Sequence, residues 1–135
     1  MISRTLADAR ARIARHSAAE AAAADALIVD LRSHDERYRN GVIPGSIHVP
    51  RSVLEWRCDP TSGYANPVIV ESERPLILVC AEGYSSSLAA AGQIDLGVRD
   101  VGDLDGGYEA WVAAGLPTME APPPEAGLPG MGHPC

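Results

Sequence analysis

Short apolar runs alternate with more polar, helix-like segments along most of the chain. The clearest runs are residues 26–31 and 75–80, whose length and composition fit strands that are buried on both faces. Residues 47–49 and 98–104 predict two further short strands. Strands that alternate with helices are typical of a parallel sheet covered by helices on both sides. The pattern therefore predicts an α/β fold.

Helices are expected between these strands. Ser17 and Glu20 have the spacing of a capping box, in front of a run of alanines. Residues 58–67 are rich in Pro, Gly, Ser and Asn and predict a loop. The other helices are predicted from polar–apolar spacing and from Gly or Pro stop signals, over residues 3–15, 35–40, 53–56, 86–96 and 108–114.

The composition changes near residue 117. Residues 118–135 are mostly Pro, Gly and small side chains, which bury too little apolar surface to offset the entropy cost of ordering. A length of 135 residues suits a single domain. We therefore predict one folded domain over residues 1–117, followed by a flexible C-terminal tail.

Charge and cysteine content exclude several function classes. The formal net charge of −7 argues against binding to nucleic acid or to an anionic membrane surface, and no apolar run is long enough to span a bilayer. Cys58, Cys80 and Cys135 are odd in number and widely spaced, so they predict neither a disulfide framework nor a C-x2-C metal pair. We expect a cytoplasmic protein without a metal or other cofactor.

The candidate chemistry lies at Cys80, which ends the clearest predicted strand and precedes a short loop and a helix. Ligands bind at the carboxyl ends of parallel strands, where loop amides and the start of the next helix stabilise an anion. Cysteine thiols in such positions are known with pKa values lowered to roughly 3.5–7.5. Gly83 allows the loop to bend, and the serines at 85–87 offer hydroxyl groups. Taken alone, the pattern fits an inert, buried cysteine equally well.

Three segments of the chain carry further sequence patterns. The first is Val29-Asp30-Leu31-Arg32 followed by Gly41-Val42-Ile43-Pro44-Gly45-Ser46-Ile47-His48-Val49-Pro50. The second starts at Cys80 and runs into Leu88-Ala89-Ala90. The third is Leu104-Asp105-Gly106-Gly107-Tyr108-Glu109-Ala110-Trp111 with Ala114-Gly115-Leu116-Pro117. In order and spacing, the three segments together resemble the signatures of the rhodanese family, and the resemblance covers residues 13–117.

This resemblance implies a three-layer sandwich with a central parallel sheet of about five strands. It also implies a sulfurtransferase or sulfur carrier, in which the Cys80 thiolate accepts sulfane sulfur from a small-molecule donor as a persulfide. The sulfur then passes to a thiol, to a cyanide-like acceptor or to a protein. By position, the resemblance assigns the loop that cradles the persulfide to Ala81, Glu82, Gly83, Tyr84, Ser85 and Ser86.

Other charged residues near the predicted strand ends are candidates for a supporting role. Asp30 and Arg32 would support the loop through hydrogen bonds, although a purely structural ion pair is the favoured interpretation. Arg57 is suited to receiving an anionic donor, because a guanidinium group binds oxyanions with two hydrogen bonds. For both Arg57 and Arg51, solvated surface charge is the simpler interpretation.

The loop departs from the family pattern in its charge. Family members often have an arginine five residues after the cysteine, where this chain has Ser85, and Glu82 adds a negative charge. We therefore expect thiosulfate to be a poor donor. A non-catalytic, rhodanese-like binding module is the alternative function, and the retained Cys80 argues against it. A phosphatase or arsenate reductase would need C-x5-R, and Ser86 occupies the arginine position.

Overall fold

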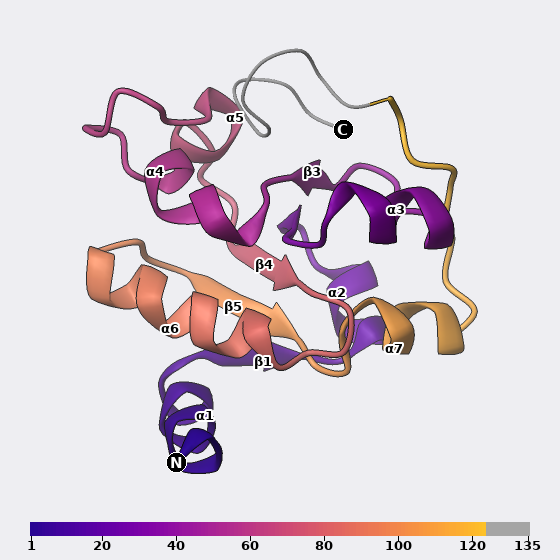
Figure 1. Cartoon of the computed structure of the whole chain (residues 1–135), viewed down its shortest axis with the longest axis horizontal. Helices are drawn as coiled ribbons and strands as arrows, with labels where there is room; N and C mark the ends of the chain where they lie inside the picture. The colour runs from indigo at the N-terminus through magenta and orange to yellow at the C-terminus, as the bar shows by residue number, and fades with distance from the viewer. Residues whose placement is uncertain (124–135) are drawn as a thin grey trace.

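A parallel sheet forms the centre of the molecule in the computed structural model, which describes residues 1–123 (Figure 1). Its strand order is β1-β5-β4-β2-β3, and all four pairings are parallel. The predicted α/β class and the five-stranded parallel sheet are therefore confirmed. The strands are β1 (Ala14–His16), β2 (Leu27–Asp30), β3 (Ile47–His48), β4 (Leu76–Val79) and β5 (Val101–Leu104).

The helices begin and end close to the predicted positions. Ser17 and Glu20 make both hydrogen bonds of the predicted capping box, and Ser33 and Glu36 form a second one. No helix in residues 1–123 is long and apolar enough to cross a membrane. The helices are α1 (Ile2–Arg12), α2 (Ala18–Ala23), α3 (His34–Asn40), α4 (Leu54–Cys58), α5 (Pro67–Val70), α6 (Ser85–Leu96) and α7 (Gly107–Ala113), with a 3-10 turn η1 (Arg51–Val53) before α4.

The core has two halves, one on each face of the sheet. In β4, Leu76 and Leu78 pack with residues of α4, α5 and α6, while Ile77 and Val79 pack with residues of α2 and α7. Every residue of this strand is buried. Side chains of a strand alternate between faces, so a continuous apolar run fills both halves at once. The strand thereby becomes a rigid support for whatever follows its carboxyl end.

Two elements of the fold were not predicted. Residues 14 and 15 were expected to end a helix over residues 3–15, but with His16 they form the edge strand β1, whose only partner within residues 1–123 is β5. The two strands approach so closely that a Cβ on Gly102 would lie 2.1 Å from the carbonyl oxygen of Ala14. The short helix α5 begins after Asn66, whose side chain accepts a hydrogen bond from the N–H of Val68 at 2.9 Å.

The chain after residue 117 is attached to the domain at its start. Met119 and Val42 exchange two backbone hydrogen bonds, of 2.8 and 2.9 Å. The indole N–H of Trp111 donates to the carbonyl oxygen of Pro117 at 2.8 Å. The backbone of Met119 is therefore bound to the domain, although its side chain is exposed. The rest of the predicted tail, residues 124–135 with Cys135, lies outside the described residues.

Candidate active site

Cys80 directly follows β4 and lies inside a loop formed by residues 81–84. Its side chain is buried, and its Sγ accepts hydrogen bonds from the backbone N–H groups of Gly83 at 3.1 Å and Ser86 at 3.4 Å. Gly83 has a φ of +86°, and a Cβ there would lie 2.7 Å from the backbone nitrogen of Gly106. Glycine is thus required for the loop to close around the sulfur.

The pKa of the Cys80 thiol is set by two opposing effects. Burial of the thiol raises its pKa, whereas hydrogen bonds from Ser86, Ser85 and Gly83 lower it. The hydrogen bonds outweigh burial, so the pKa of Cys80 lies below its ordinary value. A lowered pKa increases the fraction of thiolate, which is the nucleophilic form of cysteine.

The glycine pair of the third signature packs against the back of this loop. A Cβ on Gly107 would lie 2.5 Å from the carbonyl oxygen of Cys80. Two backbone N–H groups at the start of α7 donate to carbonyl oxygens of the loop. The N–H of Tyr108 donates to Cys80 at 2.9 Å, and the N–H of Glu109 donates to Ala81 at 3.1 Å. The signature therefore fixes the position of the loop backbone.

Cys80 opens into a pocket of about 410 Å³. A second pocket of about 400 Å³ shares Arg32, Glu36 and Ala81 with the first and is bounded by residues of α7. Positively and negatively charged side chains both line the first pocket. Its lining residues are Leu31, Arg32, Glu36, Arg51, Cys80, Ala81, Glu82, Tyr84 and Ser85.

Asp30 and Arg32 form the buried ion pair favoured by the sequence interpretation. The Arg32 guanidinium donates to both carboxylate oxygens of Asp30, at 3.0 and 2.9 Å, and to the carbonyl oxygen of Gly41 at 2.8 Å. It also stacks over the Tyr108 ring at 3.7 Å. Arg32 is therefore fixed in place while it lines the pocket.

Of the two arginines that follow β3, Arg51 and not Arg57 lines the Cys80 pocket. Arg57 is completely buried and donates to the carbonyl oxygen of Tyr64 at 2.6 Å, so it is neither a surface charge nor a lining residue of this pocket. Arg51 is half-exposed and paired with Glu55 at 2.9 Å. Arg51 follows β3 as Cys80 follows β4, so both lie at the carboxyl ends of parallel strands. This shared position could have identified Arg51 from the sequence.

Asp103 of β5 is a further residue that sequence reasoning missed. It is completely buried, and its carboxylate accepts hydrogen bonds from the hydroxyls of Ser86 at 2.8 Å and Ser87 at 2.7 Å. Arg15 of β1 forms an ion pair with it at 2.9 Å. The first turn of α6 is thus anchored to the sheet beneath Cys80.

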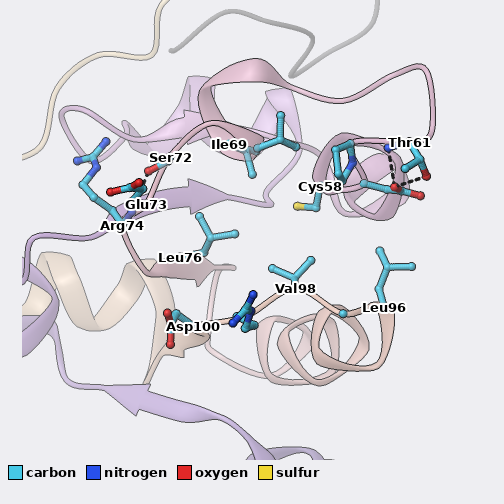
Figure 2. Close-up of a pocket in the computed structure, with 15 residues that line it drawn as sticks. Cys58, Thr61, Ile69, Ser72, Glu73, Arg74, Leu76, Leu96, Val98 and Asp100 are labelled. Atoms are coloured by element: carbon cyan, nitrogen blue, oxygen red, sulfur yellow. Dashed lines mark hydrogen bonds between the residues drawn. The ribbon is translucent and has the colours of Figure 1, made fainter.

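A larger cavity of about 890 Å³ lies at the other end of the strands from Cys80, near the starts of β4 and β5 (Figure 2). Its walls include Cys58, Leu76 and Asp100. Burial raises the pKa of Cys58 to about 12, with the nearby carboxylate of Glu55 adding to the effect. This thiol is therefore protonated and inert near neutral pH, so the size of the cavity does not indicate the reactive site. Residues 1–123 contain no cluster of metal-ligating side chains.

Comparisons with known proteins agree with the geometry at Cys80. The model of the rhodanese-like domain matches residues 11–114. A thiosulfate sulfurtransferase GlpE from Pseudomonas paraeruginosa is 35% identical over 107 residues, covering 78% of this chain and 87% of the relative. The GlpE of Stutzerimonas stutzeri is 38% identical over 88 residues, covering 65% of this chain and 72% of the relative.

A solved structure from Rhodopseudomonas palustris has a TM-score of 0.82 and 36% identity, covering 88% of this chain and 94% of that one. It is described as a protein of unknown function and a possible tyrosine phosphatase. The match to the family model extends over most of the chain and includes the loop at Cys80. This protein belongs to the rhodanese-like domain family.

Proposed function

We propose that this sulfurtransferase carries sulfane sulfur as a persulfide on Cys80. The observation that carries the proposal is the position of the Cys80 sulfur, which two backbone N–H groups contact from within a loop at the carboxyl end of a buried strand. Fixed amide donors stabilise negative charge on sulfur without having to reorient during the reaction. The names of the GlpE relatives support the same reaction class.

The reaction has two displacement steps. The Cys80 thiolate attacks the outer sulfur of the donor, a new S–S bond forms, and the rest of the donor leaves with the electron pair of the broken bond. With thiosulfate this leaving group is sulfite. A thiol or cyanide then attacks the outer sulfur of the persulfide, and Cys80 leaves as the thiolate. The N–H groups of Gly83 and Ser86 serve the thiolate at the start and the end of this cycle.

The choice of donor depends on the charges around the pocket. Glu36 and Glu82 disfavour a dianion, and Ser85 provides no positive charge within the loop. Arg51 is the half-exposed cation on the pocket wall, and we propose that it receives the anionic part of a donor. The balance still favours an uncharged persulfide over thiosulfate. A cytoplasmic thiol or protein cysteine is the acceptor we propose.

A phosphatase is the second function to consider, because of the description of the Rhodopseudomonas palustris protein. Phosphatase loops of this kind close around an oxyanion with the arginine of a C-x5-R motif. Here the corresponding residue is Ser86, which is completely buried and donates its hydroxyl hydrogen to Asp103. This position therefore provides no guanidinium to bind a phosphate, and sulfur transfer is the better supported activity. A non-catalytic module would not need the lowered pKa of Cys80.

Intact mass spectrometry tests the proposal directly. The protein is incubated in turn with thiosulfate, 3-mercaptopyruvate and glutathione persulfide, and a gain of one sulfur atom is expected with at least one of them. Cys80→Ser should lose this gain and all transfer to cyanide, whereas Cys58→Ser should keep both, because Cys58 is inert. Persistent transfer by the Cys80→Ser variant would disprove the role of Cys80.

A further inference from the structure

Two arginines from the N-terminal segment bind one carbonyl group of the Cys80 loop. The carbonyl oxygen of Gly83 accepts a hydrogen bond from Nη2 of Arg10 at 2.8 Å and from Nη2 of Arg15 at 3.1 Å. Arg10 lies near the end of α1, and Arg15 lies in β1. Two cationic donors on one backbone carbonyl form unusually strong, charge-assisted contacts.

Arg10 makes three contacts with the loop and with the first turn of α6. Besides the Gly83 carbonyl, its Nε donates to the hydroxyl of Ser87 at 3.1 Å, and its guanidinium lies 5.5 Å from the centre of the Tyr84 ring. Arg10 precedes the residues that match the family model, which begin at residue 11. The contact is therefore an addition to the part of the chain that matches the family.

Arg15 is held in place by carboxylates on the sheet. It pairs with the buried Asp103 at 2.9 Å and with Asp105 at 3.0 Å. These pairs orient its guanidinium group so that Nη2 reaches the Gly83 carbonyl. The two arginines thus approach the loop from two separately anchored elements.

Gly83 itself connects this contact to the sulfur. Its carbonyl oxygen accepts from the two arginines, and its own N–H donates to the Sγ of Cys80 at 3.1 Å. Neither Arg10 nor Arg15 lines the Cys80 pocket, so both act on the loop from its outer side.

We propose that Arg10, together with Arg15, is a positioning residue that holds the Cys80 loop in the orientation in which its amides face the sulfur. The two arginines provide, from outside the loop, the positive charge that Ser85 does not provide within it. The value of this arrangement for catalysis rests on the function proposed above. The positioning itself is measurable on the thiol alone, without any sulfur donor.

The test compares Arg10→Ala and Arg10→Lys with Arg12→Ala as the matched control. Arg12 lies on the same helix and pairs with Asp95 of α6 on the exposed surface, so its removal weakens the packing of α1 without touching the loop. All variants carry Cys58→Ser and Cys135→Ser, so that Cys80 is the single thiol. The rate of alkylation by iodoacetamide is measured between pH 4 and pH 10.

Arg10→Ala should raise the apparent pKa of Cys80 by about half a unit to one unit, which is about threefold to tenfold slower alkylation on the acidic side. Arg10→Lys should recover part of the shift, because it keeps the charge with fewer donors. Arg12→Ala should match the parent protein. Thermal melting of each variant establishes that the fold is retained.

A parent-like titration in Arg10→Ala would overturn the proposal. An equal shift in Arg12→Ala would also overturn it, since the effect would then come from loosening α1 in general. Arg15→Gln combined with Asp103→Asn removes the second positive charge without leaving an unpaired buried charge, and it should add to the shift of Arg10→Ala. Absence of sulfur uptake by the wild type would defeat the proposed function and leave this result intact.

Discussion

The hydroxyl of Ser86 donates its hydrogen to the buried carboxylate of Asp103 at 2.8 Å. A hydroxyl has a single hydrogen, so the same group cannot also donate to the Cys80 sulfur. A hydrogen bond from the Ser86 side chain to the sulfur would also lower the pKa of Cys80. We assign the hydroxyl hydrogen to Asp103, because a carboxylate oxygen is a much stronger acceptor than sulfur. The Ser85 side chain and the backbone N–H groups of Ser86 and Gly83 then stabilise the thiolate.

Ser86→Ala should therefore change stability more than it changes the reactivity of the thiol. We expect a loss of about 1–3 kcal/mol in the free energy of unfolding, because Asp103 loses a buried donor. The apparent pKa of Cys80, measured by alkylation, should move by less than about half a unit. Ser85→Ala is the contrasting variant, because a hydrogen bond from the Ser85 side chain lowers the pKa of Cys80, so its loss should raise that pKa with little change in stability. A large rise in the pKa with unchanged stability in Ser86→Ala would show that the Ser86 hydroxyl serves the sulfur instead.

The lowered pKa of Cys80 predicts the pH dependence of the first step. Sulfur uptake requires the thiolate, so kcat/KM for the donor should fall as pH drops through the pKa of the folded protein and should be constant above it. Because this pKa is lowered, the half-maximal rate should occur below about pH 8.5, the value for a free thiol. Absorbance of the thiolate at 240 nm gives an independent titration. A midpoint at or above the free-thiol value would contradict the prediction.

The charges on the pocket wall should determine how well thiosulfate competes with uncharged donors. Glu82→Gln should raise kcat/KM for thiosulfate severalfold at low salt by removing a repulsion, and Arg51→Gln should lower it by a similar factor. Both side chains are at least partly exposed, so high salt should reduce both effects. A neutral alkyl persulfide is the control donor, and its rate should hardly change. Equal effects on both donors would show that charge does not select the donor.

The Met119 contact predicts where the chain can be shortened. Ending the chain at Pro117 removes the two backbone hydrogen bonds with Val42, which should lower the free energy of unfolding by about 1–3 kcal/mol. A chain that ends at Pro123 keeps them and should melt like the full chain. Chemical denaturation of the two truncated proteins separates the outcomes. Equal stability of both would show that the Met119 contact contributes little.

The sequence was most informative where the apolar pattern is strong. The four-residue core of β4 is buried throughout, and the capping box at Ser17 marks the start of α2. β1 was missed because Ala14–His16 is a short, partly exposed edge strand without apolar alternation. Its pairing depends on the closely packed Gly102, which lies far away in the sequence.

At the candidate site, local sequence identified the cysteine and its loop but not the residues that support them. Arg10 and Arg15 lie 73 and 68 positions before Gly83, and Asp103 lies 17 positions after Ser86. Spacing along a chain predicts neighbours within one element, whereas these contacts arise from the sheet order. Arg57 was misplaced for the same reason, since its burial depends on how the 58–67 loop folds back over it.

The sheet order also determines when, during synthesis, the surroundings of the Cys80 thiol can form. Among the strands of residues 1–123, β1 is made first, and its only partner there is β5, which is made last. Arg15 therefore has no carboxylate to pair with until Asp103 has emerged, and Arg10 has no loop to bind until Gly83 has emerged. Assembly of the thiol environment must wait for almost the whole domain, so a nascent or stalled chain would expose Cys80 as an ordinary cysteine.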